Sequence, residues 1–390
     1  MRLTVNCLLL LWAFQWIMYG CQQKSAADFT EGEDYAVYQL TRMMDTAGFN
    51  KPVEAYSLLL PKDWTHTGEV EWKVGTSCDG TNSWLKAFSN NKKNSFEIFR
   101  PVTFGWSDDA ETKQFMEKKC GGVSQPMKAE EYLRKVFAPQ ELGGPEILKV
   151  ETNNAVIEQM GKNDERIRNE QQQNGTGKIL FYHSAVSAYL RWPDGGEGIV
   201  VLGVSTMGGE IPNNYNGTIS KLSTTTVSPR IVFKYPAGKE ESAKNQFAVL
   251  MGSFKTNTAW HEAVDNIWKE NKKENDWIIW ERNIGNDSFN FSMHNRAIQN
   301  GNNLLNQMDT GYRNWEMHQS SQDQIHTNFI KSIRDVQNFQ DQSGKYEMTS
   351  PYDHAWSRDD GRTFVMSNNP NFDPQFVFQD QSWKEMKKVN

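Results

Sequence analysis

The chain has 390 residues, of which 42 are basic and 48 acidic, so its formal net charge is −6 at neutral pH. Because there is neither a basic excess nor a basic cluster, this composition excludes nucleic acid as an expected partner. The mean hydropathy of −0.71 and the lack of any apolar run of membrane length after the first 20 residues exclude a chain that crosses a membrane repeatedly.

A secretory signal peptide is predicted over residues 1–20. Arg2 is the only charged residue before Lys24, and an apolar block over residues 7–14 continues through Trp16 to Met18. A basic start followed by a short apolar core is typical of such a signal, and the block is short of the roughly 20 apolar residues that a membrane span needs. We therefore expect these residues to be removed on export.

Gly20-Cys21, at the end of this block, resembles the lipobox of bacterial lipoproteins. In that family the signal is cut before the cysteine, whose sulfur then carries a diacylglyceryl group. The resemblance implies that Cys21 is lipidated and that acyl chains such as palmitate anchor the protein in the bacterial cell envelope. Gln22, after the cysteine, favours the outer membrane. The alternative is an ordinary signal peptide with a chance cysteine.

Two further cysteines, Cys78 and Cys120, remain in the mature chain. In an exported protein, two leftover cysteines predict one disulfide. The alternative is a cysteine nucleophile with His183 as its base, but no local sequence signature accompanies either cysteine.

Residues 35–273 predict an α+β domain, in which an antiparallel sheet is packed by helices. Residues 218–227, rich in Ser and Thr, are expected to form a loop. Apolar residues at helical spacing predict helices over residues 127–137, 239–252 and 258–273. Alternating patterns and turn residues predict strands over residues 35–40, 53–60, 69–74, 84–89, 95–101, 147–152, 178–192, 198–206 and 230–235.

Three short segments in this domain resemble bacterial domains of the PsbP-like fold. Leu60-Pro61-Lys62-Asp63-Trp64, followed by Val70-Glu71-Trp72, resembles their opening, and residues 247–254 resemble their closing helix with its Ser-Phe exit. The resemblance implies an antiparallel sheet between helices. It also implies a non-enzymatic role, since members of that family mostly serve as assembly or accessory factors.

The remaining chain is predicted to form a long amphipathic helical region and a small β module. Apolar residues recur every seven positions after Phe291, which is the period of a coiled coil. Met308, Tyr312 and Trp315 would be its partner-binding patch, although a helix lying on its own first domain is an equal alternative. Asp359-Asp360-Gly361 predicts a hairpin turn. The expected division is a signal peptide (1–20), a lipidated tether (21–34), an α+β domain (35–273), the helical region (274–339) and the β module (340–390).

Motifs for catalysis are incomplete. His261 and Asp265 match only half of the zinc-binding His-Glu-x-x-His helix, and residues 203–207 lack the second Gly of a nucleophile elbow. There is no phosphate-binding loop and no dinucleotide-binding glycine pattern. We therefore expect no catalytic residues, cofactor or metal.

Fourteen tryptophans are the strongest indication of a ligand. Tryptophan stacks on sugar faces, but it also closes small cores. Trp106, next to Asp108 and Asp109 in an expected loop, is the candidate glycan-binding residue. The leading hypothesis is a membrane-anchored, non-enzymatic binding or scaffolding lipoprotein. A glycan-binding surface lipoprotein is the alternative, and an unrecognised hydrolase is a third hypothesis.

Overall fold

The structure is a computed structural model, and half of its described residues lie in strands and 22% in helices. It describes residues 28–73, 80–110, 113–114, 122–162, 164–165, 168–169, 179–212, 219–281, 336–342, 344 and 346–389.

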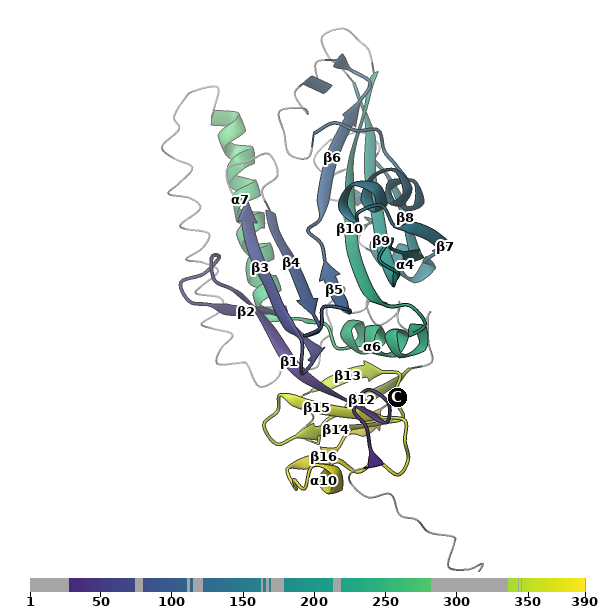
Figure 1. Cartoon of the computed structure of the whole chain (residues 1–390). Helices are drawn as coiled ribbons and strands as arrows, with labels where there is room; N and C mark the ends of the chain where they lie inside the picture. The colour runs from purple at the N-terminus through teal and green to yellow at the C-terminus, as the bar shows by residue number, and fades with distance from the viewer. Residues whose placement is uncertain are drawn as a thin grey trace, which may run out of the picture.

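The first sheet, sheet A, joins the two ends of the described chain (Figure 1). Its strand order is β11-β2-β1-β15-β14-β16, and all neighbours are antiparallel. Strand β1 pairs with β2 along one edge and with β15 along the other, so the C-terminal hairpin extends the N-terminal strands. The strands are β1 (Tyr35–Asp45), β2 (Val53–Pro61), β11 (Lys255–Thr256), β14 (His354–Arg358), β15 (Thr363–Ser367) and β16 (Trp383–Glu385).

The largest sheet, sheet B, has eight strands in the order β3-β4-β5-β10-β9-β8-β7, and β6 also pairs with β10. Strand β10 is long enough to pair with β6 along its first part and with β5 along its second part. The strands are β3 (Thr65–Lys73), β4 (Gly80–Phe88), β5 (Ser95–Ile98), β6 (Val102–Ser107), β7 (Glu146–Thr152), β8 (Ile179–Arg191), β9 (Gly196–Pro212) and β10 (Ile219–Pro236).

A third, small sheet, sheet C, packs below helix α6 (Figure 1). Its order is β13-β12-β17, from β12 (Gln337–Gln340), β13 (Glu347–Ser350) and β17 (Lys387–Val389). The helices are α3 (Ala129–Tyr132), the π-helical segment η2 (Leu133–Glu141) that continues it, α4 (Asn154–Gly161), α6 (Glu240–Gly252), α7 (Thr258–Glu281) and α10 (Pro374–Val377).

Four apolar clusters form the core. The largest lies between one face of sheet B and helices α4, α6 and α7. The second lies on the opposite face of sheet B, beneath α3 and η2. The third fills the space between sheets A and C, and the fourth covers the other face of sheet A beside α10. Sheet B is therefore covered on both faces where its strands are most apolar.

A buried carboxylate links three elements of the largest cluster. Asp45, at the end of β1, is fully buried, and its Oδ2 accepts hydrogen bonds from the indoles of Trp72 at 2.9 Å and Trp260 at 2.8 Å. Its Oδ1 accepts from the backbone N–H groups of Ala47 and Gly48. A side chain at Gly48 would place its Cβ 2.3 Å from the Trp72 ring. The turn after β1 thus requires this glycine and satisfies this carboxylate completely.

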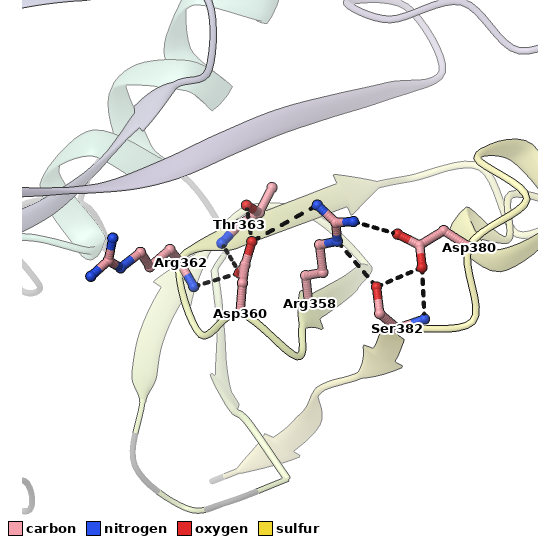
Figure 2. A network of polar contacts seen from close by, with 6 residues as sticks. All are labelled: Arg358, Asp360, Arg362, Thr363, Asp380 and Ser382. Carbon is pink, nitrogen blue, oxygen red and sulfur yellow. Dashed lines mark hydrogen bonds and ion pairs between the residues drawn. The ribbon is translucent and has the colours of Figure 1, made fainter.

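A second polar network closes the β14–β15 hairpin (Figure 2). Asp360 accepts from the backbone N–H groups of Arg362 and Thr363, and these bonds lower its pKa although burial, the largest single effect, opposes them. Arg358 contacts Asp380 at 2.9 Å and donates to the Ser382 hydroxyl at 3.1 Å. The network ties the hairpin turn to the segment before β16.

The predicted fold class is wrong in its balance of helix and strand. The described chain is mostly antiparallel sheet with short helices. Residues 337–339, expected at the end of the long helix, lie in strand β12. The C-terminal hairpin is present, and its strand β15 pairs with the N-terminal strand β1. A segment of that size gains a core by joining an existing sheet.

Most individual elements match the expected ones, including the long β8–β9 hairpin and helix α6. Two expected loops are wrong. Residues 219–227 form the first half of β10, because β6 and β9 satisfy their backbone groups on both sides. Trp106 lies in strand β6 rather than in a loop. Helix α7 continues to Glu281, eight residues further than expected.

Candidate functional site

The long strands β8, β9 and β10 have two halves of different chemistry. The inner half comprises residues 185–191, 196–204 and 227–236, and the outer half comprises residues 179–184, 205–212 and 219–226. Strand β6 pairs with the outer half of β10 (Figure 1). The inner half is mostly buried and aliphatic, whereas the outer half is rich in Ser, Thr and Gly. The outer half is where the candidate site lies.

One face of the outer half carries Trp106. Strand register places Trp106 opposite Ser223, Ser223 opposite Gly208, and Gly208 opposite Leu180. Tyr182 lies two residues from Leu180 and therefore on the same face. We call these five residues the aromatic face. It has large side chains on its two outer strands and small ones on the two strands between them.

The aromatic face is open to solvent at its edges. Tyr182 is 62% exposed, Leu180 is 42% exposed and Trp106 is half-buried. In the floor, the buried hydroxyl of Ser223 has no hydrogen-bond partner among the residues that the structure describes. Ser223 is only 6% exposed, so a ligand on this face would contact mainly the side chains at its edges.

The inner part of the same face is already covered by protein. Val123 forms a bridge with Gly105 in β6, and the N–H of Ala129 donates to the Ser184 hydroxyl in β8. The segment between them therefore crosses over β10 and β9 and leads into α3. Beneath α3 and η2 the sheet presents aliphatic side chains such as Val204 and Val227. The floor becomes polar beyond this crossing.

Most other described tryptophans have structural roles. Trp64, Trp72, Trp192, Trp260, Trp268, Trp356 and Trp383 all belong to or pack against the apolar clusters. Trp84 carries the guanidinium of Arg100 over its ring at 4.7 Å. Trp106 belongs to none of these clusters, which leaves its ring as the one we assign to recognition.

The opposite face of the outer half carries a polar row across four strands. Strand register places His183 opposite Ser205, Ser205 opposite Thr226 and Thr226 opposite Thr103. Nε2 of His183 lies 2.9 Å and 3.1 Å from the two carboxylate oxygens of Asp164. The hydroxyls of Thr103 and Thr226 are 3.2 Å apart and hydrogen-bonded. We call His183, Ser205, Thr226 and Thr103 the polar row.

A cavity of about 290 Å³ lies at the inner end of β7 and β8, beside the start of α6. Burial raises the pKa of Tyr189 in its wall, and the ammonium groups of Lys149 and Lys244 lie over that ring at 5.9 and 5.7 Å. Each cation of the lining has its own carboxylate: Lys149 with Glu151, Arg191 with Glu197 and Lys244 with Glu240. These charges are compensated within the protein and do not favour a charged ligand.

Several predicted site residues lie outside the described residues: Cys21, Cys78, Cys120, Met308, Tyr312 and Trp315. The lipidation, disulfide and helix-docking assignments therefore stay predictions. His261 and Asp265 lie on an exposed face of α7, 3.8 Å apart. Within the part of the chain that the structure describes, no group of three or more His, Cys, Asp and Glu side chains is placed to hold a metal ion.

Sequence patterns single out Trp106 but not its neighbours. They also identify His183 as a possible base and include Ser205 in an incomplete nucleophile motif, but they do not predict that the two residues are neighbours. The signal that could have joined them is the β8–β9 hairpin itself, because its turn at residues 193–195 fixes which residues face each other. Asp164 has no such signal, since its position depends on how the chain after α4 packs on the sheet.

No described helix combines the length and apolar character needed to cross a membrane. The resemblance to the PsbP-like fold stays a prediction. Comparison of the chain with protein-family models, with curated proteins and with solved structures found no match.

Proposed function

We propose that this protein is a lipid-anchored glycan-binding protein of the bacterial cell envelope, and that the aromatic face is its ligand site. The observation that carries the proposal is the pairing of an uncommitted Trp106 ring with the exposed Tyr182 ring across a floor of Ser223 and Gly208. The large side chains flank the floor, so an extended ligand would cross the strands between them.

The chemistry of this floor favours a saccharide over an apolar protein segment. Where the same face meets α3 and η2, the sheet uses aliphatic side chains and buries them fully. Beyond the crossing, hydroxyls and a glycine replace them. A sugar presents C–H groups that stack on aromatic rings and hydroxyls that stay in contact with water, so it matches an exposed ring such as that of Tyr182 beside a polar floor.

The leading hypothesis from the sequence, scaffolding of another protein, depends on Met308, Tyr312 and Trp315, which lie outside the described residues, and it stays a prediction. The anchor is a separate part of the proposal and depends on Cys21 alone. Two or more acyl chains are needed for stable anchoring. Cys21→Ser should therefore move the protein from the membrane fraction to the soluble fraction, and a variant that still sediments with membranes would contradict the anchor.

Binding can be tested by affinity electrophoresis in gels that contain neutral glucans, mannans or xylans, and by co-sedimentation with insoluble peptidoglycan. We expect the wild type to be retained by at least one of these probes. Trp106→Ala with Tyr182→Ala should weaken that retention about tenfold, since two stacking contacts of about 0.5–1.5 kcal/mol each are lost. The melting temperature should hardly change.

Phe376→Ala is the matched control, because Phe376 is a 53% exposed aromatic side chain on α10, in the part of the molecule built on sheet A. It should leave retention unchanged. The proposal is wrong if no probe retains the wild type, or if the double variant of the aromatic face binds as well as Phe376→Ala does.

A further inference from the structure

The imidazole of His183 is held in one tautomer and has an unused nitrogen. Both oxygens of the Asp164 carboxylate lie within hydrogen-bond distance of Nε2, so Nε2 carries the proton and donates it. Nδ1 is then the acceptor. It is buried and has no hydrogen-bond partner among the described residues. The His183 side chain is only 10% exposed and the Asp164 side chain 19%, so water competes little for this contact.

The cross-strand partner of His183 on β9 is a serine, Ser205. The carbonyl of Ala185 accepts a hydrogen bond from the N–H of Asn153, so it points away from β9. Residues two apart in a strand point their backbone groups the same way, and His183–Ser205 is therefore a non-hydrogen-bonded pair. In such pairs the Cα atoms are about 4.5 Å apart and the side chains approach closely. The Ser205 hydroxyl does not hydrogen-bond to Nδ1 in this structure. Rotation of this short side chain would bring it towards the near nitrogen, Nδ1, rather than towards Nε2.

A donor for a developing negative charge lies on the next strand. Thr226 is the cross-strand neighbour of Ser205, and its hydroxyl is hydrogen-bonded to the hydroxyl of Thr103. Two hydroxyls have two hydrogens, so one hydrogen of this pair remains free to donate. A preorganised hydroxyl next to the nucleophile can stabilise an oxyanion.

We propose that Ser205 is the nucleophile and His183 the general base of an ester-hydrolysing site, with Asp164 as the positioning residue. Ser205 Oγ attacks the carbonyl carbon of an ester, and His183 Nδ1 accepts the hydroxyl proton. The bond from the carbonyl carbon to the alkoxy oxygen breaks, and the proton passes to the leaving alkoxide. Water then hydrolyses the acyl-serine by the same two steps. The activity lies on the opposite face from the glycan site and does not depend on it.

The surroundings of Ser205 indicate the acyl group. Towards the inner half, Gly203 is required because a Cβ there would lie 2.7 Å from the carbonyl oxygen of Ser228 and 2.8 Å from Pro229. The backbone of β10 therefore leaves no room for an acyl group on that side of Ser205. Towards the outer end, the neighbouring pair on the same face is Phe181 and Met207, of which Met207 is 37% exposed. The guanidinium of Arg168 lies over the Phe181 ring, 5.6 Å from its centroid, and limits the apolar surface on that side. An acyl chain that extends in this direction would lie over Met207, which favours esters of short acyl groups.

The site can be tested with a fluorophosphonate probe and with p-nitrophenyl acetate and butyrate, on the detergent-solubilised full-length protein. We expect the probe to form one adduct, on the peptide that contains Ser205. Ser205→Ala should lose labelling and lower ester hydrolysis at least 100-fold, the scale of a lost acid–base partner. Ser83→Ala, a half-buried serine on strand β4, is the matched control and should keep both activities.

Asp164→Asn distinguishes positioning from mere packing. An amide cannot stabilise the imidazolium that forms during the reaction as a carboxylate does, so kcat should fall while KM stays close to the wild-type value. The proposal is overturned if the folded wild type is labelled at a serine other than Ser205 or is not labelled, or if Ser205→Ala hydrolyses both esters at the wild-type rate. If Ser205→Ala lowers the melting temperature, its loss of activity could come from misfolding. The test then rests on mass spectrometry of the labelled wild type, which shows whether Ser205 carries the probe.

Discussion

The inner and outer halves of β8, β9 and β10 share the same strands and the same pairing but have opposite surface chemistry. In the inner half, side chains such as Leu202 and Phe233 are fully buried between helices on both faces of the sheet. In the outer half, Ser, Thr and Gly replace most of the aliphatic residues, and the Tyr182 ring is 62% exposed. One continuous set of strands thus provides stability at one end and ligand-binding surfaces at the other.

The difference shows how a sheet can separate these two tasks. Backbone pairing keeps the outer half in register whatever its side chains are, because β6 and β9 satisfy the groups of β10. Its side chains are therefore free to be polar. The inner half stabilises the order of the whole sheet through apolar burial. Substitutions in the two halves should accordingly separate stability from binding.

The largest expected effect comes from comparing two residues of β10. Phe233 is fully buried and stacks on Phe247 with ring centroids 5.5 Å apart, whereas Thr224 in the outer half is only half-buried. Phe233→Ala should lower the free energy of unfolding by about 3–5 kcal/mol. Thr224→Ala should change it by less than about 0.5 kcal/mol. Urea unfolding measures both, and equal losses would break the comparison between the halves.

A second prediction tests whether the two halves differ in the polarity of their side chains or in how fully their polar groups are hydrogen-bonded. Asp45 is polar and belongs to the stable core, where four N–H groups donate to it. Asp45→Asn replaces one acceptor oxygen with an NH₂ group, so two buried donors lose their acceptor, at a cost of about 1–3 kcal/mol each before relaxation. We expect a loss of about 3 kcal/mol in urea unfolding. An unchanged urea midpoint would show that the stability of the core does not depend on the hydrogen bonds to Asp45.

Sequence patterns predict the inner half well and the outer half poorly. Continuous apolar runs at 198–204 and 230–235 indicate strands by themselves, because short runs of this kind are typical of strands that are buried on both faces. The polarity of the run Leu222-Ser223-Thr224-Thr225-Thr226 predicts a loop instead. Threonine is β-branched and fits a pleated strand, so this run pairs readily once β6 and β9 flank it. Polarity alone does not distinguish such a strand from a loop.

The candidate sites are predictable only in part, for a related reason. The aromatic character of Trp106 indicates recognition, but its floor comes from Ser223 and Gly208, which are far away in the sequence. The polar row could be predicted only if the register of β8 and β9, which pairs His183 with Ser205, were known. Sheet order and register bring these residues together, and both are decided by tertiary packing of the inner half.

The smallest expected effect concerns charge at the inner end of the β8–β9 hairpin. Asp194 contacts the ammonium of Lys234 at 2.6 Å and accepts from the N–H of Gly196 at 2.9 Å. The hydrogen bond from Lys234 and then that from Gly196 lower the pKa of Asp194 below its ordinary value of 3.8. A carboxylate with a lowered pKa in the folded state stabilises the protein above its unfolded pKa. That contribution is lost as the pH falls through the folded value.

Asp194→Asn removes the titrating group and keeps the side-chain shape. Because Asp194 is 64% exposed, solvent screens its ion pair, and the variant should lose only about 0.5 kcal/mol at pH 7. Urea unfolding between about pH 7 and pH 3 should show the difference between wild type and variant shrinking below about pH 4. Thr224→Ala, in the outer half of the neighbouring strand, should keep a constant difference from wild type over that range. If the difference for Asp194→Asn also stays constant, the ion pair does not hold the hairpin end, and apolar burial alone accounts for the stability of the inner half.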